Sequence, residues 1–245
     1  LYFRISGRIN YFAFMKKQLL VYGSGRHTVP FLKYMAEATG KKKPNLCFIP
    51  TASGEDQEYI DSFYQVCSQI NVTPHVLSVW INSYDQKESF EEIISSMDAI
   101  VIGGGNTLNM LAIWKAQGID IALKKAYDNG VVMGGGSAGS LCWFNGGTTD
   151  SRPKKLSIVE GMSFIDKSHC PHYNSEKSRR PLYHNNIISG ELTDGYACDD
   201  RSAIHFIDDK VHTSVSLDPD NNSYYVYLKE DGLVEEELIP NSIIS

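Results

Sequence analysis

Short apolar runs alternate with longer segments of helical spacing along the first 150 or so residues of the chain. A short continuous apolar run is typical of a buried strand, and apolar residues three or four positions apart are typical of a helix that faces a core. Their alternation indicates consecutive βα units and a parallel sheet. The predicted strands are residues 18–22, 46–49, 73–79, 99–102 and 131–133, and the predicted helices are residues 30–39, 56–70, 90–97, 107–114 and 119–129.

The pattern changes after about residue 150, where short apolar runs are separated by turns rich in Asp, Asn and Gly. These runs predict short strands at residues 196–198, 203–207, 211–215 and 224–228. No internal repeat or linker-like tract divides the sequence. We therefore predict an α/β domain with a doubly wound, mostly parallel sheet, helices on both of its faces and a strand-rich C-terminal third.

Composition and charge narrow the class of protein. The 245 residues are 42% hydrophobic and 21% charged, which suffices for the core of one globular domain. A formal charge of -6 argues against a nucleic-acid partner, which requires a basic face. Since no run of about 18 apolar residues is present, we expect no membrane span. Five scattered cysteines without a CxxC pair favour reduced thiols in a cytoplasmic protein over a disulfide framework or a zinc site.

The N-terminal residues are set apart from the predicted domain. Residues 1–14 precede Met15, which is followed by two lysines and resembles a natural start. We expect residues 1–14 to be a tag or an upstream extension, with a native extension as the alternative, and residues 15–245 to form a single α/β domain. The apolar stretch after Met15 reaches Gly23 too soon for a signal peptide, so we do not expect export.

The strongest motif is Gly135-Gly136-Ser137-Ala138-Gly139, which directly follows a predicted strand and fits the pattern G-x-S-x-G. In a nucleophile elbow the serine sits on a strained strand-to-helix turn, and small neighbours let the strand and helix pass closely. Backbone N–H groups at the start of the helix can stabilise a developing oxyanion. The alternative is an ordinary glycine-rich βα turn, but the apolar strand immediately before the motif favours Ser137 as a nucleophile.

A second glycine-rich turn, Gly103-Gly104-Gly105-Asn106-Thr107, follows another predicted strand. Ligands of open α/β sheets bind at such strand ends, so its N–H groups could complete an oxyanion hole beside Ser137. Asn106 or Thr107 is expected to cap the following helix. The alternatives are a phosphate-binding turn or a simple helix entry, and the segment does not fit G-x-x-x-x-G-K-[ST].

A serine nucleophile requires a base and a carboxylate that orients it. Among seven histidines, His172 has the best local setting, because Pro171 restrains the chain and the polar residues Tyr173-Asn174-Ser175 follow. Asp150, Asp199 and Asp200 are all candidates for the carboxylate, although each could equally be a solvated turn residue. The other histidines are His27, His75, His169, His184, His205 and His212.

Together, residues 103–107, residues 135–140 and Pro171-His172-Tyr173 resemble the peptidase E and cyanophycinase family of serine hydrolases. The resemblance spans about residues 18–215. It implies a class I glutamine amidotransferase-like fold, which is a flavodoxin-like three-layer sandwich, and a site without metal or cofactor. It also implies roles for individual residues: Ser137 as nucleophile, His172 as base, and backbone N–H groups of Gly104, Gly105 and Ala138 as the oxyanion hole.

The resemblance leaves the carboxylate open between Asp150, in a Thr-rich turn, and Asp200, which follows the histidine. It links a preference for N-terminal Asp to an arginine after the histidine, and here Arg179 and Arg180 are the candidates. A guanidinium can hold a carboxylate through two parallel bonds, although a solvated basic cluster is the alternative. Asn106 and Thr107 complete the expected substrate-binding set.

The expected function is that of a serine peptidase, a dipeptidase or small-peptide hydrolase that forms an acyl-enzyme, with N-terminal Asp as the candidate specificity. The expected partner is a small peptide, and the protein is expected to be a monomer or a homodimer. Two alternatives stay open. One is an enzyme with a cysteine nucleophile, for which Cys142 lies nearest to the elbow in sequence, and the other is a catalytically silent binding protein with the same fold.

Overall fold

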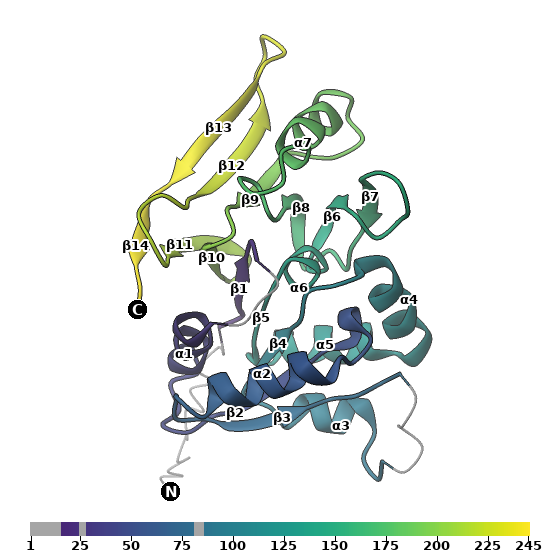
Figure 1. Cartoon of the computed structure of the whole chain (residues 1–245), viewed down its shortest axis with the longest axis vertical. Helices are drawn as coiled ribbons and strands as arrows, with labels where there is room; N and C mark the ends of the chain where they lie inside the picture. The colour runs from purple at the N-terminus through teal and green to yellow at the C-terminus, as the bar shows by residue number, and fades with distance from the viewer. Residues whose placement is uncertain (1–15, 25–27, 81–85) are drawn as a thin grey trace, which may run out of the picture.

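The computed structural model describes residues 16–24, 28–80 and 86–245, and two β-sheets organise this part of the chain (Figure 1). The larger sheet has eight strands in the order β14-β11-β10-β1-β5-β4-β2-β3, and the smaller has six in the order β13-β12-β9-β8-β6-β7. The strands are β1 Gln18–Tyr22, β2 Asn45–Ile49, β3 Thr73–Val76, β4 Ala99–Ile102, β5 Val132–Gly136, β6 Phe144–Thr149, β7 Ser157–Glu160, β8 Ile165–Cys170, β9 Gly195–Cys198, β10 Ser202–Ile207, β11 Lys210–Ser216, β12 Ser223–Leu228, β13 Val234–Ile239 and β14 Asn241–Ile243.

The helices between these strands are α1 Val29–Ala38, α2 Gln57–Cys67, α3 Phe90–Ser95, α4 Thr107–Gln117, α5 Ile119–Asp128, α6 Ala138–Leu141 and α7 Arg179–Ile188, with a 3-10 turn, η1 Thr51–Ser53. Each adjacent pair among β1, β5, β4, β2 and β3 is parallel. The sheet continues beyond β1 through antiparallel β10 and β11. This arrangement confirms the predicted α/β class and the strand-rich C-terminal region.

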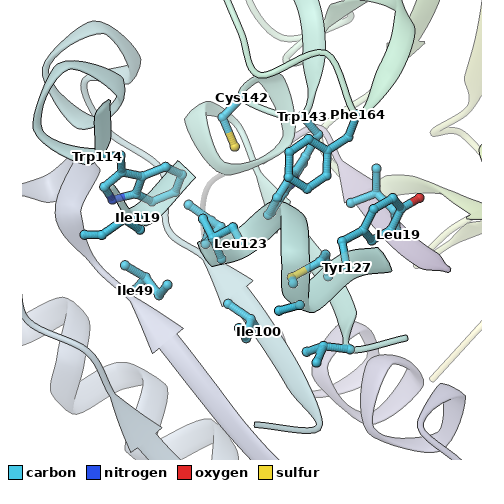
Figure 2. Close-up of a cluster of buried hydrophobic side chains, with 14 of the residues drawn as sticks. Leu19, Ile49, Ile100, Trp114, Ile119, Leu123, Tyr127, Cys142, Trp143 and Phe164 are labelled. Carbon is cyan, nitrogen blue, oxygen red and sulfur yellow. The ribbon is translucent and has the colours of Figure 1, made fainter. Parts of the chain in front are cut away.

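The two faces of the large sheet carry separate apolar cores, because successive side chains of a strand point to opposite faces. On β1, Leu20 and Tyr22 pack with α1 and α2, whereas Leu19 and Val21 pack with α3 to α6. Figure 2 shows the second of these clusters, in which the rings of Trp143 and Phe164 lie together. Burial on both faces explains why the parallel strands are continuous apolar runs in the sequence.

The smaller sheet is covered by α7, whose Tyr183 and Ile187 pack on Cys170 and Val226. The sequence predicted two strands of this sheet, at residues 196–198 (β9) and 224–228 (β12), but missed β6, β7, β8, β13 and α7. Two of the missed strands read FNGGTT and IDKSHC, and the helix reads RRPLYHNNII, so polar residues and glycines obscure the apolar period. In contrast, the strands predicted at residues 18–22 and 99–102 are confirmed with the same bounds.

Several of the predicted strands and helices begin or end a few residues away from the observed positions. The strand predicted at residues 131–133 runs to Gly136, since its glycines pair with β1 and β4. The expected cap Asn106 accepts the N–H of Asn109 and so begins α4, while α2 is shorter than predicted and begins after Asp56. Residues 1–14, His27 and the Gly25 end of the first turn lie outside the described residues.

Replacing Gly139 with Ala should destabilise the protein. The added Cβ would overlap the carbonyl oxygen of Ile102, where α6 crosses β4, so the helix must move away from the sheet. Overpacking of this kind costs about 3 kcal/mol. Urea denaturation should show this loss, whereas Gly40→Ala, which meets nothing within 4 Å, should cost only the strain of its φ of +68°, about 1 kcal/mol. Equal losses in the two variants would contradict the close-packing explanation.

Candidate active site

Ser137 lies on the sharp turn between β5 and α6, with φ 55° and ψ −118°. Such a backbone conformation is costly for a residue other than glycine and persists only where the surroundings impose it. Its N–H donates to the carbonyl of Tyr22 at 3.3 Å, and its own carbonyl accepts the N–H groups of Ser140 and Leu141 at 3.0 and 2.9 Å. These bonds hold the turn between the end of β1 and the first turn of α6.

Ser137, His172 and Asp200 form a continuous chain of hydrogen bonds. The Nε2 atom of His172 lies 2.8 Å from Ser137 Oγ, and its Nδ1 atom lies 2.7 Å from Asp200 Oδ1. His172 follows β8, and Asp200 lies in the turn that joins β9 to β10. His172 also has a left-handed backbone, with φ 55°, so two of the three residues hold strained conformations.

The partners of His172 determine which of its nitrogens carries the proton. An ionised carboxylate only accepts hydrogen bonds, so Nδ1 donates to Asp200 and Nε2 is left to accept from the Ser137 hydroxyl. The hydrogen bond from His172 lowers the pKa of Asp200, against an opposing effect of partial burial. Asp200 therefore stays ionised near neutral pH and holds the imidazole in the tautomer that a general base requires.

The other candidate carboxylates lie elsewhere. Asp150 is exposed at the end of β6, next to Ser151, whose carbonyl accepts from Asn106 Nδ2 at 3.1 Å. Asp199 is buried, and its Oδ2 accepts the N–H of Asn222 at 2.8 Å. Burial raises the pKa of Asp199 to about 6. Of the three candidate carboxylates, Asp200 is therefore the one that contacts His172, and Asp150 and Asp199 are not.

The second glycine turn is fixed against η1, since the N–H of Asn106 donates to the carbonyl of Ala52 at 2.8 Å. The N–H of Gly104 donates to Tyr59 Oη at 3.3 Å, a contact that the sequence did not predict. Thr107, expected to bind substrate, is buried, and Asn106 uses its side chain to cap α4 and to hold Ser151.

Both candidate arginines have partners within the chain. Arg179 is 3% exposed, and donates from Nε to Glu176 at 2.8 Å and from Nη1 to the carbonyl of Thr148 at 2.7 Å. Arg180 is half-exposed and forms a two-bond ion pair with Glu236. Sequence reasoning missed Glu236, because nothing in the order of residues indicates that β13 returns to this helix.

Comparisons with known proteins identify the family of this chain. The sequence pattern described as Peptidase family S51 matches residues 19–214. The chain belongs to peptidase family S51. It is 38% identical over 224 residues to the uncharacterized peptidase YgaJ of Bacillus subtilis (strain 168), an alignment covering 89% of this chain and 96% of that protein. The predicted resemblance to peptidase E is therefore confirmed at the level of the family, and this chain is a peptidase.

Solved structures support the fold of this S51 peptidase. A candidate peptidase E from Listeria monocytogenes EGD-e superposes with a TM-score of 0.63 at 20% identity, covering 83% of this chain and 100% of that one. A peptidase from an acI-B1 actinobacterium superposes with a TM-score of 0.71 at 17% identity, covering 95% and 97% of the two chains.

Cys142 and a second histidine, His169, both contact the helix that follows Ser137 in this S51 peptidase. Cys142 is fully buried in the core cluster shown in Figure 2, and burial raises the pKa of its thiol. A buried, protonated thiol makes a poor nucleophile, which argues against the cysteine alternative. His169 lies 3.0 Å from Ser140 Oγ, and burial lowers its pKa to about 3, so it supports the elbow as a neutral ring.

The described residues show neither a metal-binding cluster nor a membrane-spanning helix. Within residues 16–24, 28–80 and 86–245, no group of three or more His, Cys, Asp or Glu side chains is placed to hold a metal ion. Across the same ranges, every helix is too short or too polar to cross a membrane.

The raised pKa of Asp199 makes a testable contribution to stability. Its folded pKa of about 6 exceeds the unfolded value near 4, so this group lowers the free energy of unfolding as pH rises between those values. Asp199→Asn removes that loss and keeps an acceptor for Asn222. Relative to the parent protein, the variant should gain up to about 3 kcal/mol between pH 4 and pH 7. Urea denaturation at several pH values measures this difference, and a constant difference would contradict the assignment.

Proposed function

We propose that this S51 peptidase is a single-domain, serine-type hydrolase of small peptides, with Ser137 as nucleophile, His172 as general base and Asp200 as the orienting carboxylate. The observation that supports this most strongly is the chain of hydrogen bonds from Ser137 Oγ through His172 to Asp200, at 2.8 and 2.7 Å. A catalytically silent relative would have no need of these contacts or of two strained backbones.

In the proposed reaction, His172 Nε2 takes the proton of Ser137 as Oγ attacks the scissile carbonyl carbon. The amine then leaves with the proton from His172, which gives an ester on Ser137. Water attacks that ester after His172 removes its proton, and the released serine takes the proton back. Asp200 stays ionised throughout and stabilises the imidazolium that forms in each half of the reaction.

We assign the oxyanion hole to backbone N–H groups of Ala138 and Gly105. Ala138 directly follows the nucleophile, the position used by other strand-turn-helix elbows. Gly104 shapes the second turn rather than binding the oxyanion, because its N–H already donates to Tyr59. Donors that are fixed before the reaction stabilise the developing charge without reorganising.

The specificity for N-terminal Asp remains a hypothesis, and the pairing of the arginines constrains it. The guanidinium of Arg179 is buried, so Arg180 is the candidate that a substrate carboxylate could reach. Such a carboxylate must compete with Glu236 for Arg180. A dipeptide panel with Asp, Glu, Ala and β-aspartyl N-termini tests this: selective hydrolysis of Asp-X supports the clamp, and equal rates rule it out.

Ser137→Ala should lower kcat on the best peptide of that panel by about 10⁴- to 10⁶-fold, because the nucleophile is lost. The variant should unfold at the same urea concentration as the parent protein. A fluorophosphonate should label the parent protein at Ser137 and leave the variant unlabelled. The exposed serine of α3 gives a matched control, Ser95→Ala, which should keep full activity. Full activity of Ser137→Ala would exclude the proposed mechanism.

Asp200→Asn should lower kcat by about 10³- to 10⁴-fold, since an amide can donate to Nδ1 and favour the wrong tautomer of His172. Asp150→Asn is the matched comparison, and it should change kcat by less than threefold, because Asp150 is exposed and away from Nδ1 of His172. Steady-state kinetics on one peptide measures both. A larger loss in the Asp150 variant would reverse the choice between the two carboxylates.

A further inference from the structure

Four residues near the C-terminal end of the described chain form hydrogen bonds that hold the segments around His172 and Asp200. They are Asn221, Asn222, Glu236 and Asn241, and we call them the C-terminal brace. All four follow residue 214, where the match to the family ends. Each of them bonds a residue next to His172 or Asp200, or another member of the brace.

On the side of Asp200, the brace fixes the turn between β9 and β10. Asp199 and Asn222 are joined twice, since the N–H of Asp199 donates to the Asn222 carbonyl at 3.0 Å and Asp199 Oδ2 accepts in return at 2.8 Å. Asn241 Nδ2 donates to Asn222 Oδ1 at 3.1 Å and to the carbonyl of Asn221 at 3.2 Å. The residue before Asp200 is thereby tied to β14.

Asn174, which the brace residue Asn221 holds, links the segment of His172 to that of Asp200. Asn174 accepts the N–H of Asp200 at 3.2 Å, and its Nδ2 donates to Asn221 Oδ1 at 2.9 Å. Since Asn174 lies two residues after His172, this pair of bonds sets the spacing between the histidine segment and the carboxylate turn.

On the side of His172, the brace acts on the next residue, Tyr173. The Tyr173 hydroxyl donates to Glu236 Oε1 at 2.5 Å, and its ring is 2% exposed between α7 and β12. Glu236 is itself held by Arg180 and by His184 Nε2, the latter at 2.8 Å. The backbone N–H of Tyr173 donates to the carbonyl of Cys198 at 3.1 Å. Both ends of Tyr173 are therefore anchored.

Anchoring of Tyr173 matters because His172 has a left-handed backbone, which relaxes unless its neighbours prevent it. We propose that the C-terminal brace positions His172 and Asp200 for catalysis, and that Glu236 is a positioning residue that acts on His172 through the Tyr173 hydroxyl. Glu236 touches neither Ser137 nor His172 in any contact of the described structure, so it orients the base without reacting. This inference rests on the proposed serine mechanism.

The test compares Glu236→Ala with Glu237→Ala in the full-length chain. Glu237 is the next residue of β13 and is exposed, so its side chain points to the opposite face of the strand. On a peptide with an N-terminal Ala, which has no side-chain carboxylate to compete for Arg180, Glu236→Ala should lower kcat by about 10- to 100-fold with less than a threefold change in KM, since small misplacements of a base cost this much. The rate of fluorophosphonate labelling of Ser137 should fall by the same factor. Glu237→Ala should match the parent protein in both.

Two further variants separate positioning from a general loss of structure. Tyr173→Phe removes only the hydroxyl, which bonds both Glu236 Oε1 and His184 Nε2, so it should lower kcat at least as much as Glu236→Ala, and the double variant should be no worse than Tyr173→Phe alone. Glu236→Gln keeps an acceptor for Tyr173 and should recover most of the kcat lost in Glu236→Ala. Additive losses, or a Gln variant as slow as the Ala variant, would overturn the route through Tyr173.

The outcomes also separate this inference from the proposed function. If the parent protein neither hydrolyses a peptide nor reacts with the fluorophosphonate, the serine mechanism itself fails. If the parent protein is active and Glu236→Ala retains its kcat and labelling rate, only the positioning role of the brace is wrong.

Discussion

A Cβ atom added at Gly136 would overlap the carbonyl oxygen of Ser24, and one added at Gly139 would overlap that of Ile102. The chain therefore passes from β5 into α6 through a space that admits backbone and little else. This close approach forces the turn at Ser137 into its left-handed conformation and places Oγ at the carboxyl end of the parallel strands, where ligands of open α/β sheets bind. The rest of the site is arranged around that point.

Ser137, His172 and Asp200 come from both sheets. Their contact depends on the connection between β9 of the small sheet and β10 of the large one. Ser137 ends a strand of the large sheet, and His172 follows β8 of the small one. Asp200 lies between β9 of the small sheet and β10 of the large one, and its carbonyl accepts the N–H of Ser24 at the end of β1. Pairing of β10 with β1 thus fixes the carboxylate relative to the elbow.

The sequence was informative where one physical requirement dominates a segment. Strands buried on both faces must be apolar, and a tight elbow must have small residues, so the parallel core and Ser137 could be predicted. In the small sheet β9 and β12 were predicted, but the other strands and α7 were not, because strands such as β6 combine glycines with threonines and α7 carries Pro181 and polar residues. The choice between Asp150 and Asp200 also depended on long-range pairing, which local spacing does not determine.

The role of Glu236 is even harder to predict from local sequence. Its contact with Tyr173 spans 63 residues and depends on the register that places Val226 opposite Glu236 in the β12–β13 pair. A shift of that register by one residue would turn the carboxylate to the other face of the strand. Only the folded pairing, and no local motif, brings it to the histidine segment.

The adjacent carboxylates Asp199 and Asp200 show how the environment assigns different tasks to the same residue type. A hydrogen bond from His172 lowers the pKa of Asp200, whereas burial and the charge of Asp200 raise that of Asp199. Two neighbouring carboxyl groups resist being ionised together, so the raised pKa of Asp199 follows partly from the charge kept on Asp200. The bond from the backbone of Asn222 partly offsets that rise and occupies Oδ2 of Asp199. The negative charge that faces His172 is therefore that of Asp200, and Asp199 serves to hold the turn on which Asp200 stands.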